Sequence, residues 1–235
     1  MKLTIQSEFL AGVRDELPIL LGVAPFGMIY GVLALSAGIP PAAAQSMSAI
    51  VFAGSSQFIA AQLVASGSSA ALIVLTIGIV NLRHALYSAS LAPYLKKLSP
   101  TWKWLLSYLL TDEAYAVSIT HFQKDNLGNA HLTSAADQRH WYFFGAGLAL
   151  WSIWQVSTGV GIFLGQQVPK SWSLDFTLPL TFLALVIPGL NDRASLAAAL
   201  SAGLVALLAF SLPFKLGLIL AALVGISVGL WSESR

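Results

Sequence analysis

The chain has 235 residues, of which 57% are hydrophobic and 9% are charged, and its mean hydropathy is +0.76. A soluble domain carries about 25% charged residues, so this composition excludes an ordinary soluble protein and indicates a polytopic helical membrane protein. The formal net charge of +2 gives no reason to expect a nucleic-acid partner, and a cysteine count of 0 excludes disulfides and cysteine metal sites.

The apolar runs predict an all-α fold with about seven or eight transmembrane segments. Residues 1–16 form a polar lead, in which Ser7 to Arg14 could be a surface helix; charges before the first apolar run argue against a cleavable signal peptide. The spans are expected at about 17–37, 42–65, 70–94, 102–122, 141–164, 174–190, 194–210 and 214–231.

The order of these spans suggests one transmembrane domain, 1–235, built on an inverted repeat. Residues 17–95 would be the first three-helix unit and residues 102–190 the second, with a C-terminal helical hairpin at 194–231. Three spans is an odd number, so the two units would have opposite orientations in the membrane.

Four consecutive small or polar residues, Gly54, Ser55, Ser56 and Gln57, interrupt the second apolar run. They would point all round a regular helix, so a local break lining a cavity is one explanation, and its freed N–H groups could hold a carboxylate. The alternative is that the serines bond to the preceding turn while Gln57 bonds a neighbouring helix.

The stretch from Ala70 to Tyr94 is long enough to span a bilayer, yet it carries charge near its middle. An arginine at this depth costs from about 3 kcal/mol upward, so it normally faces protein or water. On a helix the polar residues form two adjacent stripes, one of Arg83, Tyr87, Ser90 and Tyr94 and the other of Asn81, His84 and Ser88. We therefore expect this helix to wall a polar cavity.

Two acids, Asp112 and Glu113, lie at the centre of the expected fourth span. Arg83 and His84 are the possible partners of such an intramembrane carboxylate, which could also carry a proton. A static ion pair that holds two helices together is the alternative. The widely spaced His121, His131 and His140 give no zinc signature and are expected at the surface.

Lysines after the third span leave the orientation open. Lys96, Lys97 and Lys103 place their loop in the cytoplasm by the positive-inside rule, which puts the N-terminus outside after three spans. Lys2 and Arg14 argue for the opposite orientation.

Four motifs in this order resemble the AzlC-type branched-chain amino acid permeases: LGVAPFGMIYGVLA from Leu21, FAGSSQF from Phe52, NLRHALYSASLAPYL from Asn81 and LLTDEAYAV from Leu109. The resemblance covers nearly the whole chain, although it is carried by pattern rather than by sharp motifs after Trp141. It implies export of branched-chain amino acids across the bacterial inner (cytoplasmic) membrane, with a small AzlD-type membrane subunit and with no enzyme chemistry or cofactor.

We expect Gly54 to Gln57, Asn81, Arg83 and Tyr87 to bind substrate, with Phe26, Phe58 and Leu86 lining an apolar pocket. Asp112, Glu113 and His84 are the candidates for proton coupling. Two other classes remain possible: an intramembrane hydrolase using Ser55 or Ser56 with His84, and a channel or non-transporting subunit.

Overall fold

The computed structural model describes residues 4–128, 138–167, 190, 192–211 and 216–233, and every element within them is a helix. The chain divides into two compact units, residues 1–174 and 175–235. Three helical stretches among the described residues are long and apolar enough to cross a membrane: α1 (Ile5–Ser36), the interrupted pair α4–α5 (Ala70–Leu95) and α8 (Arg139–Gln167). The expected all-helical membrane class is therefore confirmed.

Helix α1 begins much earlier than the sequence pattern predicts. Thr4 and Ser7 form a capping box at its start, and the helix continues through Pro18 and Pro25. The separate polar lead expected over residues 1–16 is wrong, because residues 5–16 are the first three turns of the helix. Two of their acids, Glu8 and Glu16, are buried rather than exposed.

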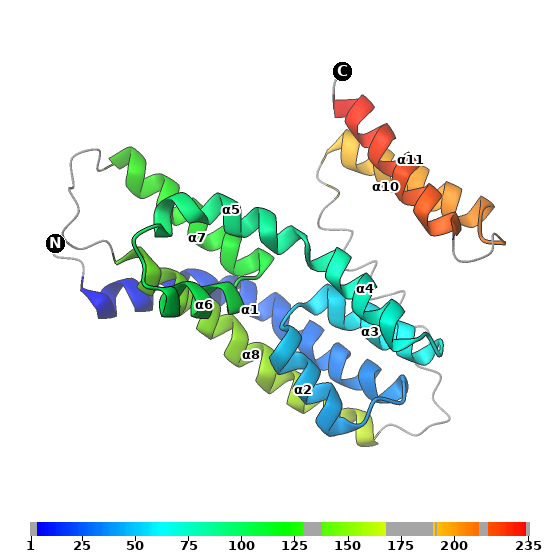
Figure 1. Ribbon diagram of the computed structural model, residues 1–235, viewed down its shortest axis with the longest axis horizontal. Helices are drawn as coiled ribbons and strands as arrows, with labels where there is room; N and C mark the ends of the chain where they lie inside the picture. The colour runs from blue at the N-terminus through cyan, green and yellow to red at the C-terminus, as the bar shows by residue number, and fades with distance from the viewer. Residues whose placement is uncertain (1–3, 129–137, 168–189, 191, 212–215, 234–235) are drawn as a thin grey trace. The chain divides into compact units, whose positions relative to one another are not determined.

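Helices α1 and α8 run side by side in the same direction (Figure 1). Glycines allow their backbones to touch: a Cβ on Gly12 would clash with the Tyr142 carbonyl oxygen, and one on Gly31 would lie 2.5 Å from that of Thr158. Near the start of both helices, the rings of Phe9 and Phe144 are 5.7 Å apart. We call this the amino end of the α1–α8 pair.

The second apolar run is a helical hairpin rather than one span. Helix α2 (Pro41–Val51) starts beside the end of α1, and α3 (Gly54–Ala65) runs back toward the same side (Figure 1). The hairpin turns at Phe52, whose φ of 41° is left-handed. Tyr30 touches both arms, donating to the Ala44 carbonyl at 3.0 Å and packing edge-on against Phe58.

A second hairpin replaces the expected fourth span and enters from the amino end of the α1–α8 pair. It consists of α6 (Pro100–Tyr108) and α7 (Asp112–Gly128). Trp102 packs against Trp141, whereas the Tyr108 hydroxyl accepts from Trp151 Nε1 at 2.7 Å, so α6 runs inward. Helix α7 returns, because His121 stacks on Tyr142 near the start of α8.

The third apolar run keeps its expected length but is interrupted at Leu82, between α4 (Ala70–Asn81) and α5 (Arg83–Leu95). The Leu82 N–H bonds the Ile79 carbonyl, a tighter turn than that of an α-helix. None of the α4 residues is buried, as expected for a helix that faces lipid or another protein.

The second unit contains the expected C-terminal hairpin, α10 (Arg193–Leu208) and α11 (Leu216–Glu233). Gly225 and Gly229 of α11 pack against Ala198 of α10, and Asp192 caps α10 by accepting from the Ser195 N–H at 2.6 Å. His131 and the expected sixth span, apart from Leu190, lie outside the described residues. The total span count and the inverted 3+3 repeat therefore stay predictions.

Candidate functional site

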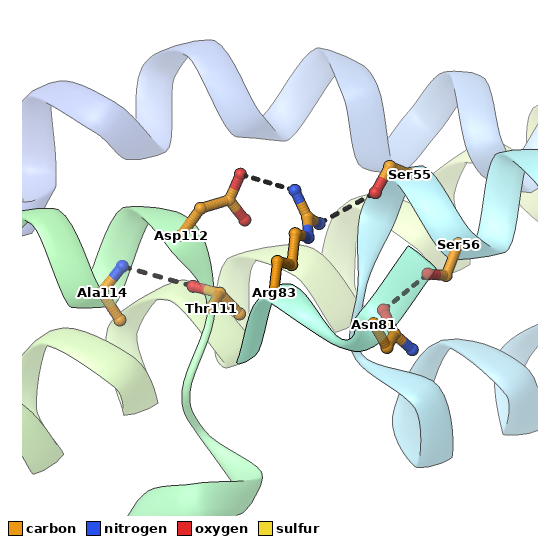
Figure 2. A network of polar contacts seen from close by, with 7 residues as sticks. All are labelled: Ser55, Ser56, Asn81, Arg83, Thr111, Asp112 and Ala114. Carbon is orange, nitrogen blue, oxygen red and sulfur yellow. Dashed lines mark hydrogen bonds and ion pairs between the residues drawn. The ribbon is translucent and has the colours of Figure 1, made fainter. Parts of the chain in front are cut away.

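Three helices begin at the same place inside the first unit, each directly after a break in an apolar run (Figure 2). Helix α3 begins at Gly54, α5 at Arg83 and α7 at Asp112. Breaks of this kind place free backbone groups and polar side chains at membrane depth, which is how many transporters build their binding sites.

The Arg83 guanidinium joins these three helices. Its Nη1 donates to Asp112 Oδ2 at 3.2 Å, and its Nη2 donates to Ser55 Oγ at 2.8 Å (Figure 2). Pairing of Arg83 with the acid of the fourth apolar run is thus confirmed. A negative charge at the start of α7 is also favoured by the helix dipole, whereas the positive charge at the start of α5 needs this partner.

The network retains unused hydrogen-bonding capacity. Arg83 Nε and His84 Nε2 are buried and have no hydrogen-bond partner within the described part of the chain. No side chain caps the start of α3. The Arg83 and Asp112 side chains are 29% and 46% exposed, so an incoming ligand can reach both charges.

Neighbouring contacts hold the three helix starts in place. Ser56 Oγ donates to Asn81 Oδ1 at 2.6 Å, which ties α3 to the end of α4 (Figure 2). Tyr87 stacks on Tyr115 with ring centroids 4.6 Å apart, and the Tyr115 hydroxyl shares a 3.0 Å hydrogen bond with Ser90. The stripe that begins at Arg83 therefore faces α7 rather than open water.

Two of the expected binding residues, Gly54 and Gln57, contact Trp154 of α8. A Cβ on Gly54 would lie 3.1 Å from the Trp154 ring, and Gln57, which is fully buried, accepts from Trp154 Nε1 at 3.1 Å. Phe26 lies partly buried on α1. The expectation that Leu86 lines a pocket is wrong, because its side chain is 72% exposed.

A cavity of about 240 Å³ lies between α5, α6 and α8. Its walls are mostly apolar, with Lys96 and Lys103 among the lining residues toward the amino end of the α1–α8 pair. Ser88 and Leu110, which are close in sequence to Arg83 and Asp112, line it as well. Ser88 belongs to one of the two polar stripes expected on this helix, whereas the sequence analysis did not predict the apolar walls formed by Leu91, Leu106, Leu110 and Phe143.

Sequence reasoning also missed a buried group of titratable residues on α1, α7 and α8. Glu16 is fully buried and Glu8 is 5% exposed. His121 Nε2 lies 3.7 Å from Glu8 Oε2, and the Tyr142 hydroxyl donates to Asp15 Oδ2 at 2.7 Å. In the sequence, the acids of α1 look like those of a surface helix. The one signal for burial is that Glu8 and Glu16 lie four residues before and after Gly12, and therefore on the helix face that touches α8.

Comparisons with known proteins agree with the resemblance drawn from the motifs. The profile described as "AzlC protein" matches residues 18–168. An "Uncharacterized membrane protein" of Archaeoglobus fulgidus is 31% identical over 95% of this chain and 94% of its own length.

Two relatives carry more specific names. "Inner membrane protein YgaZ" of Escherichia coli K12 is 28% identical over 80% of this chain and 76% of its own length. "Branched-chain amino acid transport protein AzlC" of Bacillus subtilis is 26% identical, over 78% of this chain and 68% of its own. No solved structure matches the chain.

Proposed function

Since the chain belongs to the AzlC family of membrane transport proteins, we propose that it exports branched-chain amino acids, such as valine, leucine or isoleucine, by alternating access. The observation that carries this proposal is the meeting of Ser55, Arg83 and Asp112 at three helix starts. An amino acid is a zwitterion, so its site needs one group for the carboxylate and one for the ammonium.

The carboxylate would bind where α3 and α5 begin. Arg83 has an unused Nε–H, and its planar guanidinium suits a carboxylate, which it can bind through two parallel hydrogen bonds. The uncapped N-terminal turn of α3 adds the backbone N–H groups of Gly54 to Ser56 and a favourable helix dipole, whereas the Gln57 N–H already bonds the Ala53 carbonyl. Ser55, already bonded to Arg83, would turn its hydroxyl toward the ligand.

The ammonium or the coupling proton would bind at the start of α7. Asp112 is 46% exposed, and its ion-pair partner Arg83 also belongs to the proposed carboxylate site. Binding of a substrate carboxylate to Arg83 would therefore weaken the Arg83–Asp112 ion pair. Glu113 and His84, whose Nε2 has no partner among the described residues, would exchange protons with this acid. Export would then be driven by proton entry.

The cavity of about 240 Å³ supports an apolar substrate side chain. Its leucine-rich walls suit a branched aliphatic group, and its two lysines attract the carboxylate of an arriving amino acid. We propose that it is the entry path from one side of the membrane toward Arg83.

The charge distribution supports an N-terminus in the cytoplasm. Because 42–65 is a returning hairpin, the start of α1 and the end of α5 lie at the same end of the first unit, where Arg139 also sits 5.7 Å from the Tyr94 ring. Two loops at the opposite end, 37–40 and 66–69, contain no lysine or arginine, and the sequence after α8 contains one lysine, Lys170, before residue 190. The amino end of the α1–α8 pair carries Lys96, Lys97, Lys103, Lys124 and Arg139.

A small AzlD-type membrane subunit is the proposed partner. Helix α4 buries none of its residues, and its outer side chains Val74 and Ile79 are 70% and 60% exposed. Lipid would cover such a face equally well, so the test is functional: export measured for the chain alone and together with the small subunit.

The direct test is efflux from vesicles. Proteoliposomes loaded with radiolabelled leucine, with and without the small subunit, should release it saturably when an inward proton gradient is imposed. Competition by valine and isoleucine, but not by lysine, would support the substrate class. Release that does not saturate would favour a channel, and no release with the subunit present would refute the transport proposal.

The hydrolase alternative receives less support from the same geometry. The Ser55 hydroxyl accepts from Arg83 and that of Ser56 donates to Asn81, while His84 Nε2 has no partner among the described residues. A serine nucleophile needs a hydrogen bond to its base. Labelling of Ser55 by a serine-reactive phosphonate would revive this alternative.

A further inference from the structure

Glu16 is the most unusual buried group in the first unit. Its side chain is fully buried in α1, and neither carboxyl oxygen has a hydrogen-bond partner among the described residues. A lone ionised carboxylate is costly in such surroundings, whereas a neutral carboxyl, which still carries its proton, is tolerated. Packing alone does not explain an acid at this position, because an apolar side chain of similar volume would fill the same space without the cost of burying a carboxyl group.

Titratable groups flank Glu16 on both sides along the α1–α7–α8 interface. Toward the Arg83 site, the Glu113 carboxyl lies within electrostatic range of Glu16. Toward the amino end of the α1–α8 pair, Tyr142 lies within range of Glu16 and donates to Asp15 at 2.7 Å. These groups come from three different helices, so their proximity is a product of the tertiary fold.

The row continues to the edge of the protein. The His121 ring stacks on Tyr142 with centroids 3.8 Å apart and planes 5° apart, and its Nε2 lies 3.7 Å from Glu8. The His121 side chain is 25% exposed, so it can exchange a proton with water. Ser118, buried on the same face of α7, adds a hydroxyl that has no partner among the described residues.

We propose that Glu16 is the proton carrier between the Arg83–Asp112 site and the cytoplasm, passing its proton by way of Tyr142 and Asp15. This inference rests on the proposed function, because it gives the driving proton its exit. A proton that enters from the outer side and reaches Glu113 moves to Glu16 and then, through the Tyr142 hydroxyl, to the Asp15 carboxylate, which accepts the hydrogen bond of that hydroxyl at 2.7 Å and is exposed to water. Water takes it there, and each group returns to its starting state.

A bound metal cation fits this row less well than a proton. Among the described residues, no three histidine or acidic side chains come together closely enough to hold a metal ion. The titratable groups shown close to Glu16 are Glu113 on α7 and Tyr142 on α8. Asp15 and Glu8 on α1 and His121 on α7 surround Tyr142. The positive charge of Arg83 is already shared with Asp112.

The test separates substrate exchange from proton-driven transport. In proteoliposomes with the small subunit, Glu16→Gln should keep leucine counterflow, which needs no net proton movement, within about twofold of wild type. The same variant should lose at least about tenfold of the leucine efflux driven by a proton gradient, and its remaining efflux should no longer depend on pH. Glu233→Gln, at an exposed glutamate of α11, is the matched control.

Tyr142→Phe gives an independent reading, because it keeps the ring on His121 and removes only the hydroxyl. It should slow proton-driven efflux and leave counterflow intact. Normal proton-driven efflux in Glu16→Gln, or loss of counterflow together with efflux, would overturn the proton route, as would wild-type efflux that follows a sodium gradient. If wild type itself shows neither counterflow nor efflux, it is the proposed function that fails.

Discussion

Replacing Arg83 with alanine separates the energy of its ion pair from its role in binding. Because the Arg83 and Asp112 side chains are 29% and 46% exposed, their coupling should resemble that of exposed pairs, about 0.5–1 kcal/mol, and not the 3–5 kcal/mol lost when a fully buried pair is broken. For a chain of this size, 1 kcal/mol corresponds to about 2–4 °C in the melting temperature.

Substrate binding should suffer far more. Two hydrogen bonds from a guanidinium to a carboxylate are worth about 1.5–3 kcal/mol each, so their loss should lower the apparent affinity for leucine by about 100-fold or more. Leucine binding by the detergent-solubilised protein, leucine counterflow and the melting temperature are measured together. Arg193→Ala, at an exposed arginine of α10, is the control and should change none of them.

A double-mutant cycle with Asp112→Asn completes this prediction. If Arg83 acts mainly as a structural clamp, the pair will show a coupling well above about 3 kcal/mol and Arg83→Ala will lower the melting temperature far more than stated. If Arg83→Ala melts normally and still binds leucine within about threefold of wild type, the assignment of Arg83 to the carboxylate is refuted.

Three stability predictions follow from the packing of the first unit and are read from melting temperatures in detergent. Gly31→Ala should destabilise strongly, because its Cβ would lie 2.5 Å from a backbone oxygen of α8, whereas Gly22→Ala on the same helix meets nothing within 4 Å and should be neutral; equal effects would contradict the close packing. Phe52→Gly relieves a left-handed strain of about 1–2 kcal/mol but loses a ring that is 5% exposed, worth about 3–5 kcal/mol, so it should destabilise; a gain in stability would show that the ring contributes little. Ser48→Ala should cost about 1 kcal/mol because it leaves the fully buried Thr158 hydroxyl, 3.0 Å away, without this partner, and adding Thr158→Val should recover part of the loss; additive losses would argue against the shared bond.

The chemistry of the candidate site was readable from sequence because charge at membrane depth must find a partner. Arg83 and Asp112 carry opposite charges in two different apolar runs, and the structure joins them at 3.2 Å. The second run also breaks as its polar residues suggested, although the turn falls at Phe52, just before Gly54. Whether these residues bind substrate stays a prediction.

The path of the chain could not be read in the same way. A run of about 20 apolar residues has the same composition whether it crosses the bilayer once or turns back halfway, so the sequence predicts single spans at both 42–65 and 102–122. The difference lies in contacts between distant residues, such as Tyr30 with both arms of the first hairpin. The conflict over orientation arose from this error.

Composition and hydropathy alone determined that this is an all-helical membrane protein, because the bilayer accepts few other ways of satisfying the backbone. The motifs and the intramembrane charges further determined the family and the residues around Arg83. Only the tertiary structure decided that two apolar runs are hairpins and that Glu16 is buried beside Glu113 and Tyr142. Burial depends on which helix faces lie against each other. For α1, the buried face is the one that packs against α7 and α8, and the residues of α8 lie more than 100 positions further along the chain.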